Sequence, residues 1–458
     1  TQKTTTGITR RRNAGYFARA SYSFDDAYYL TASYRRDGAS VFGADNKWGN
    51  FYAFGGAWRV THEKFMEKVR FLNDLKLKLS WGRNGNQGID PYGTLSEAVI
   101  GPGGGIAYPF GNSTVPSFGI KQNSLGNSGL GWETTNSWNF GFESAWLNNR
   151  LFVNMDVYLS RTTDQIFNRT IPSMTGFDSM KSTMGEVANR GVEFSIHSVN
   201  IENKDWRWDT NLTFWLNRNE LVHLYGEDLD GDGREDDDLG NNLFIGHSIH
   251  SIYGYKVAGI VQKDDTEYIQ ANGATPGNPK YVDVDGNGTI GVEDRTILGT
   301  SDPRFKMSLS NTLSWKNFEL YFMLTGTFGG NGYYVSENAP AFLAGGGGGA
   351  YSNNMYIPYW TEERPSNKYP AANFSGDGRF KGLQSRAFVR LQDITLSYTF
   401  NSAKIKNFGI NNLRVFFTGK NLFTITGWEN GDPELGNTIL SSTYPISTNL
   451  SLGANISF

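Results

Sequence analysis

The chain has 458 residues, enough for two or three ordinary soluble domains or for one large β-barrel. Glycine accounts for 55 residues and aromatic side chains for 14%, but the hydrophobic fraction is only 38%, so a large conventional core would be thinly supplied. The net charge of −3 argues against a nucleic-acid partner, and the absence of cysteine excludes disulfides and thiolate metal sites.

The sequence has no apolar run of about 18 residues, so it predicts no transmembrane helix. The first residue is Thr1, and no basic and apolar signal segment precedes the first predicted strand. We therefore expect this chain to be a fragment or a processed product of an exported protein.

Alternating apolar and polar residues recur along the chain in segments of roughly 9–12 residues, the length that a tilted strand needs to cross a bilayer. Successive side chains of a strand point to opposite faces, so each segment has one apolar and one polar face. Because the polar face of the last segment has no Lys or Glu, we interpret the apolar face as lipid-facing and the polar face as lining a lumen. The thirteen predicted strands are 16–24, 28–35, 52–58, 75–81, 138–146, 151–159, 192–196, 206–216, 307–315, 318–324, 394–400, 413–417 and 444–458.

Short and long connections alternate between these strands. The short ones are 25–27, 60–73, 147–150, 199–205, 316–317 and 401–412, and the long ones are 38–47, 85–131, 163–185, 218–304, 329–386 and 424–445. Outer-membrane barrels have short periplasmic turns and long extracellular loops, so this alternation predicts an antiparallel transmembrane β-barrel. The spacing of Phe65, Val69 and Leu72 also predicts a short helix within the turn at 61–72.

A motif in the long extracellular loop 218–304 predicts a calcium site. Oxygen ligands at positions 1, 3 and 5, glycine at 6, a backbone carbonyl at 7 and a carboxylate at 12 match an EF-hand-type loop. Asp at position 12 replaces the usual Glu, and its shorter reach resembles dockerin-type loops. A metal-free Asp- and Gly-rich turn is the alternative. The predicted ligands of this structural calcium are Asp283, Asp285, Asn287, Thr289 and Asp294.

A second acidic run, 228–238, is a weaker match because Leu239 occupies position 12. A solvated acidic loop explains this run as well as a metal site does.

No pattern of catalytic residues is present, so we predict that the chain is not an enzyme. His62-Glu63 is not followed by the second histidine of a zinc-protease motif. The chain has no nucleophile elbow, phosphate-binding loop or dinucleotide fingerprint.

Aromatic side chains lie beside amides in the predicted outer loops. Sugar rings stack on aromatic rings and hydrogen-bond to amides, so these loops predict a substrate-binding surface, with packing of loop on loop as the alternative. The candidate residues are Tyr333, Tyr334, Tyr351, Tyr356, Trp360 and Trp428.

Short motifs spread in order over nearly the whole chain resemble SusC/RagA-type TonB-dependent transporters of Bacteroidetes. The motifs are Arg12-Asn-Ala-Gly-Tyr-Phe-Ala-Arg-Ala-Ser-Tyr, Tyr34-Arg-Arg-Asp-Gly-Ala-Ser-Val-Phe-Gly, Ser80-Trp-Gly-Arg-Asn-Gly-Asn-Gln, Trp132-Glu-Thr-Thr, Asn189-Arg-Gly-Val-Glu, Asn421-Leu-Phe-Thr and Asp432-Pro-Glu.

The resemblance implies an outer-membrane barrel of about 22 strands with an N-terminal plug. It also implies TonB-driven import of oligosaccharides or peptides under a SusD-like lipoprotein. The plug, the TonB-contacting segment and the early strands are not in this sequence, so 1–458 would be the C-terminal portion of the barrel. An odd number of missing strands agrees with the parity that the predicted orientation requires.

The alternative is a soluble all-β, calcium-containing carbohydrate-binding or scaffold protein. Such a protein would need charged outer faces and a core shared by two sheets.

Overall fold

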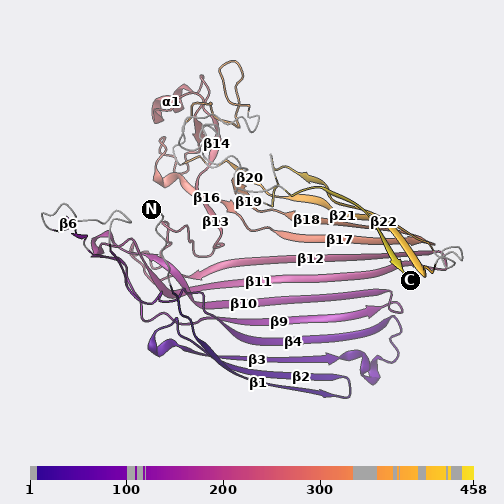
Figure 1. The fold of residues 1–458 in the computed structure, drawn as a ribbon. Coiled ribbons are helices and arrows are strands. Elements are labelled where there is room, and N and C mark those ends of the chain that lie inside the picture. The colour runs from indigo at the N-terminus through magenta and orange to yellow at the C-terminus, as the bar shows by residue number, and fades with distance from the viewer. Residues whose placement is uncertain are drawn as a thin grey trace. The chain divides into compact units, whose positions relative to one another are not determined.

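The computed structural model describes residues 8–100, 109–110, 117–118, 120–333, 358–374, 379–380, 382–400, 409–429, 432–434 and 446–458. Thirteen strands form one sheet in which each strand lies next to its neighbour in sequence, apart from small hairpins within the loops (Figure 1). This confirms the predicted number and order of strands. The strands are β1 (Asn13–Phe24), β2 (Tyr28–Ala39), β3 (Trp48–Arg59), β4 (Leu72–Asn86), β9 (Glu133–Trp146), β10 (Leu151–Thr170), β11 (Ser179–Glu202), β12 (Trp206–His223), β17 (Phe305–Trp315), β18 (Phe318–Phe328), β21 (Phe388–Phe400), β22 (Asn412–Thr426) and β23 (Asn449–Ser457).

The remaining elements lie in the connections. They are η1 (Ala44–Asn46), η2 (Val60–His62), η3 (Lys64–Met66), β5 (Glu97–Ile100), β6 (Pro109–Phe110), β7 (Ser117–Phe118), β8 (Ile120–Ser124), η4 (Ser173–Thr175), β13 (Ser251–Tyr255), β14 (Val257–Ile260), α1 (Thr266–Asn272), β15 (Pro279–Tyr281), η5 (Val292–Asp294), β16 (Arg295–Thr300), β19 (Asn331–Tyr333) and β20 (Leu383–Ser385). Within the described residues, no helix combines the length and apolarity needed to span a bilayer.

Two predictions about the connections were wrong. The expected loop at 163–185 is mostly strand, because β10 extends to Thr170 and β11 already begins at Ser179. Beyond a bilayer a strand needs only its ladder hydrogen bonds and no apolar face, so the alternating pattern ends before the strand does.

The predicted helix at 61–72 is replaced by the single turns η2 and η3. Three spaced apolar residues cannot offset the cost of nucleating an α-helix. The Asp74 carboxylate instead holds the turn, accepting hydrogen bonds from Arg59 Nε and Thr61 Oγ1, both at 2.8 Å.

The last strand also begins later than predicted. The prediction began it at 444, but β23 begins at Asn449, and Tyr444 lies outside the described residues.

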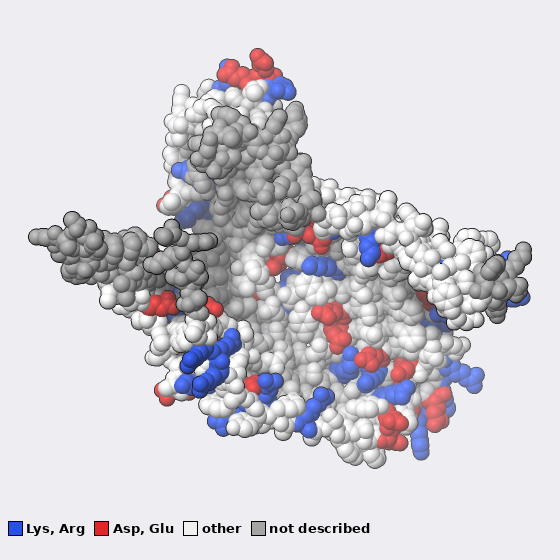
Figure 2. Space-filling model, in the orientation of Figure 1, with Lys and Arg blue, Asp and Glu red and all other residues white. Residues whose placement is uncertain are grey.

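Opposite faces of the sheet carry side chains of opposite character. The rings of Trp81 and Trp138 lie 6.3 Å apart on one face, and Trp138 is 53% exposed. On the other face, Lys78 Nζ lies 3.1 Å from Glu143 and 3.4 Å from Asp156. We call these the apolar face and the ion-paired face. Charges of both signs are interspersed over the side seen in Figure 2.

The chain divides into two compact units, the first formed by 1–195 and 217–249 and the second by 196–216 and 250–458. In the first unit, β11, the outer part of β12 and the loop after β12 form a buried apolar cluster. Its members are Val187, Leu221, Leu224 and Leu243. In the second unit, Ile260, Trp360 and Ala371 form a smaller cluster.

A partly buried carboxylate lies beside the first cluster. Glu235 Oε1 accepts hydrogen bonds from the backbone N–H groups of Leu224 at 2.7 Å and Gly226 at 2.6 Å. Burial raises the pKa of this carboxyl, but the two N–H donors and His223 outweigh burial and hold the pKa below its usual range.

Because the folded-state pKa of Glu235 is depressed, its contribution to stability is fully present above the unfolded-state pKa of about 4.3. The contribution is lost as the pH falls through the lower folded-state pKa. We therefore expect the protection factors of the amides at 224–226, which are corrected for the intrinsic exchange rate, to fall on acidification through this range, and to be low already at neutral pH in Glu235→Gln. Hydrogen exchange measures both effects, with Glu267→Gln, an exposed residue of α1, as the control. Unchanged protection in Glu235→Gln would contradict this role.

Candidate functional site

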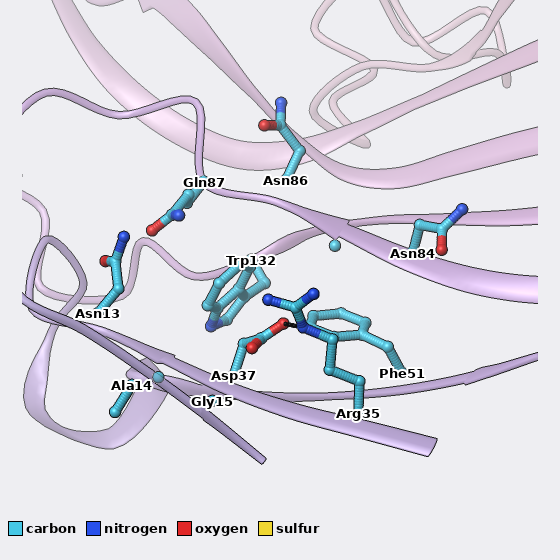
Figure 3. Close-up of a pocket in the computed structure, with 12 residues that line it drawn as sticks. Asn13, Ala14, Gly15, Arg35, Asp37, Phe51, Asn84, Asn86, Gln87 and Trp132 are labelled. Carbon is cyan, nitrogen blue, oxygen red and sulfur yellow. Dashed lines mark hydrogen bonds and ion pairs between the residues drawn. The ribbon is translucent and has the colours of Figure 1, made fainter. Parts of the chain in front are cut away.

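Four of the family-like motifs meet around one cavity of about 560 Å³ in the first unit, which we call the amide cavity (Figure 3). The first residues of β1, the last of β2, the fourth residue of β3 and the last of β4 contribute to its walls, together with Trp132 just before β9. The lining residues are Asn13, Ala14, Gly15, Arg35, Asp37, Gly38, Phe51, Asn84, Gly85, Asn86, Gln87 and Trp132.

The amide cavity exists because two neighbouring strands separate. The ladder between β3 and β4 ends at the pair Ala53 and Gly82, although both strands continue past it. Phe51 and Trp132 fill the gap, with ring centroids 5.4 Å apart in an edge-on arrangement. Trp132 Nε1 donates a 3.1 Å hydrogen bond to the Lys47 carbonyl, which fixes the ring.

Arg35 and Asp37 supply the charges of this cavity, and they neutralise each other. Arg35 Nε donates to Asp37 Oδ2 at 2.6 Å, as Figure 3 shows. Phe51 lies opposite Arg35 in the β2–β3 ladder, and Ala57, an even number of residues from Phe51, lies opposite Lys78. The cavity therefore opens on the ion-paired face.

Amide side chains provide the other polar groups of the wall. Asn86 Nδ2 donates to Glu133 at 2.7 Å, which fixes that side chain. Gln87 Oε1 is shielded from solvent and has no hydrogen-bond partner among the described residues. Burying such an acceptor destabilises the folded protein unless a ligand or water donates a hydrogen bond to it. With no net charge, two aromatic rings and several amides, the cavity suits a neutral ligand rich in hydrogen-bonding groups.

Two glycines permit this packing. A Cβ on Gly15 would lie 2.3 Å from Asp37 Oδ1, and a Cβ on Gly85 would lie 2.0 Å from Phe51 Cζ. Side chains at these positions would displace the ion pair or the ring. The sequence did not predict that these motifs form one site. Their shared position at the ends of predicted strands was the available signal.

The predicted aromatic substrate residues are spread over the second unit. Tyr334, Tyr351 and Tyr356 lie outside the described residues, and Tyr333 is the last residue of β19.

The two predicted tryptophans are buried in the outer loops. Trp360 is 8% exposed, packs on Ile260 and Ala371, and donates from Nε1 to Gln262 Oε1 at 2.8 Å. Trp428 is 7% exposed. The role of these residues in substrate binding stays a prediction.

The carboxylates of the predicted calcium loop converge. Single oxygens of Asp283, Asp285 and Asp294 all lie within 4.8 Å of one another. Asp294 is completely buried and accepts hydrogen bonds from the backbone N–H groups of Gly291 at 2.7 Å and Val284 at 2.6 Å. These donors hold the pKa of Asp294 below its usual range against the effect of burial, so the carboxylate stays ionised.

The backbone of the same loop is wrapped around its oxygen atoms. Asp283 accepts from the N–H groups of Gly286 and Gly288, both at 2.7 Å, and Asn287 Oδ1 accepts from Thr289 N at 2.8 Å. Gly286 and Gly288 have φ of 76° and 88°, the left-handed region that glycine adopts without strain. An all-oxygen donor set with three converging carboxylates fits a hard cation such as calcium.

The second acidic run, 228–238, resembles the first half of the predicted calcium loop but has no counterpart of its second half. Asp228, Asp230 and Asp232 also lie within 4.8 Å of one another, but all three are exposed. The nearby Glu235 points its carboxylate at Leu224 and Gly226 instead. No buried carboxylate among the described residues completes this run.

The motif Asp432-Pro-Glu is held by a buried arginine in the second unit. Arg390 is 1% exposed, its Nη2 lies 2.6 Å from Asp432, and it also pairs with Glu434. Arg390 Nε donates to Thr424 Oγ1 at 2.9 Å. This network anchors an outer-loop segment to β21 and β22.

Comparison with known proteins places the chain in a family. Residues 2–422 match the family model described as TonB dependent receptor-like, beta-barrel. TonB-dependent receptor P26 of Formosa agariphila is 32% identical over 97% of this chain and 46% of that protein. TonB-dependent receptor SusC of Bacteroides thetaiotaomicron is 31% identical over 98% of this chain and 44% of that protein.

A solved structure agrees with these relatives. The structure titled "Structure of the RagAB peptide transporter" has a TM-score of 0.77 and 27% identity, and covers 98% of this chain and 48% of that chain. This chain spans about half the length of the curated relatives it matches. The family is one of outer-membrane transport proteins, which confirms the predicted localisation and the expectation that the chain is not an enzyme. It also excludes the soluble alternative. The chain belongs to the TonB-dependent receptor family, as a segment of a SusC/RagA-type outer-membrane β-barrel.

Proposed function

We propose that this chain forms part of a TonB-dependent importer that takes up oligosaccharides or peptides across the outer membrane. The observation that supports this most directly is the amide cavity, which opens on the ion-paired face and carries no net charge. Oligosaccharides and peptide backbones both present dense, neutral donors and acceptors, which amide side chains and a solvent-shielded Gln87 oxygen can satisfy.

The partners we propose are a SusD-like surface lipoprotein, the TonB complex and membrane lipid. The lipoprotein and TonB follow from the similarity to SusC and to the RagAB transporter. Lipid follows from large, exposed apolar residues on the apolar face, since side chains such as Trp138 would otherwise face water.

Within the amide cavity, the rings of Phe51 and Trp132 would provide apolar contact area, and Arg35 would donate to ligand oxygens from the N–H groups that Asp37 does not use. Since Arg35 is already neutralised by Asp37, binding does not require a charged ligand. Release then needs only the exchange of neutral hydrogen bonds with water, which suits a transport site.

We expect Gln87→Ala in the intact protein to weaken binding of the transported ligand by about fivefold, the value of roughly 1 kcal/mol for one neutral hydrogen bond. Folding should be unaffected, because Gln87 Oε1 has no partner among the described residues. Isothermal titration calorimetry with a panel of neutral oligosaccharides and a panel of short peptides measures the change in affinity.

The control for this experiment is Gln122→Ala in the loop strand β8, whose Nε2 donates to the nearby Ser124 carbonyl. Equal losses in both variants, or binding of neither ligand class by the unmodified protein, would count against the amide cavity as a transport site.

We also propose that Asp283, Asp285, Asn287, Thr289 and Asp294 bind a structural calcium ion. Three carboxylate oxygens converge, one of them fully buried, and the two left-handed glycines close the loop around them. Bound calcium would neutralise the carboxylates and fix the segment between α1 and β16.

For this site we expect a dissociation constant of about 0.1–1 mM, as in other extracellular calcium modules. Asp294→Asn should remove the binding, because it deletes the buried charge, whereas Asp232→Asn in the exposed second run should leave it unchanged. Terbium luminescence with calcium competition reports both. The proposal fails if Asp294→Asn and the unmodified protein bind terbium alike.

A further inference from the structure

A second cavity of about 430 Å³ lies on the other side of Phe51 and Trp132, and we call it the arginine cavity. Both rings line it as well as the amide cavity, so they form a partition between the two. The arginine cavity is also lined by Trp48, Tyr52 and Arg83.

Strand register places Arg83 on the apolar face. In the β4–β9 ladder, Trp81 lies opposite Trp138 and Arg83 lies opposite Asn136. Because side chains two residues apart share a face, Arg83 and Asn136 continue the Trp81–Trp138 row toward the outer end of the strands. Tryptophan is enriched at the membrane–water interface, so Arg83 lies at the level of the lipid headgroups.

Arg83 has no hydrogen bond or ion pair to any described residue, and its Nε is shielded from solvent. Arg161 provides the comparison. It lies opposite the same Asn136, on β10, and pairs with Glu186 at 2.9 Å. An unpaired, partly buried guanidinium costs free energy unless an anion completes its hydrogen bonds.

An apolar groove of about 810 Å³ lies on the same face of the first unit. The small residues Ala20, Ala32 and Gly56 leave space between larger neighbours. Trp81 and Trp138 belong to its wall. The groove is therefore a space of the kind that an acyl chain fills, on a surface that meets lipid.

The groove and the arginine cavity follow each other along the strands. On β4, Arg83 comes two residues after Trp81, and on β3, Tyr52 comes two residues before Phe54, which lines the groove. At about 3.3 Å per residue, the charge lies about 7 Å beyond the end of the groove. An amphiphile with an acyl chain and a phosphate has its two parts in this order.

We propose that the groove and the arginine cavity together hold one acyl lipid whose phosphate contacts Arg83. Asp45 and Asp164 also line the cavity, and their carboxylates would repel a headgroup that carries only negative charge. An amine beside the phosphate removes this conflict. The geometry therefore selects a phosphoethanolamine-type headgroup over a purely anionic one. The site is independent of substrate uptake through the amide cavity.

The test uses the intact protein, delipidated in mild detergent and examined by native mass spectrometry with added lipid. Phosphatidylethanolamine should be retained and phosphatidylglycerol retained about tenfold less. Arg83→Gln should lower the retention of phosphatidylethanolamine at least tenfold, Arg83→Lys should lower it less, and Arg161→Gln should leave it unchanged. Ala32→Leu, which fills the groove, should lower retention without removing the charge.

Heat-modifiable migration in gels identifies variants that fail to fold, and Arg83→Lys keeps the test decisive if Arg83→Gln is one of them. Several outcomes would overturn the proposal. Inorganic phosphate that competes as well as the lipid would show a simple anion site. Equal retention of the two lipids would show that Asp45 and Asp164 do not select against a purely anionic headgroup. Equal loss in Arg83→Gln and Arg161→Gln would show only a general effect of surface charge.

Discussion

The requirement that every backbone N–H and C=O be paired within a bilayer governs this structure, because hydrocarbon offers no hydrogen-bonding partner. The chain meets it with a sheet of thirteen strands in sequence order. Once each strand is fixed in its ladder, its side chains can only alternate between two faces. One face carries Trp81 and Trp138, and the other carries Lys78 between Glu143 and Asp156.

The position where this ladder is interrupted has the most functional consequence. Above Ala53 and Gly82, β3 and β4 separate, and the space is taken by Phe51 and by Trp132 from the following loop. A filled gap between strands has two sides, so it creates one cavity on each face of the sheet. The proposed site for the transported ligand and the proposed site for a lipid thus share a partition of two aromatic rings.

Buried and partly buried polar groups hold the outer loops, rather than a continuous apolar core. Asp294 is buried beneath backbone N–H donors in the calcium-type loop, the partly buried Glu235 accepts from backbone N–H groups after β12, and the buried Arg390 holds the Asp432-Pro-Glu segment. Each group is satisfied by several partners, which is what makes its burial tolerable. Such loops can extend far from the sheet without burying much apolar surface.

The sequence by itself determined the strand number, the order of the strands, the two-faced character of the sheet and the spacing of the calcium-type loop, because these depend on local periodicity of two residues and on fixed ligand spacing. It did not determine the true ends of β10 and β11, since a strand beyond the bilayer loses its apolar signal while keeping its ladder. Only the tertiary structure decided that Arg35, Gln87 and Trp132 share a cavity and that Arg83 Nε has no hydrogen-bond partner among the described residues. Both facts depend on where β3 and β4 separate and on which loop, distant in sequence, fills the gap. No local sequence pattern encodes contacts between residues so far apart in the chain.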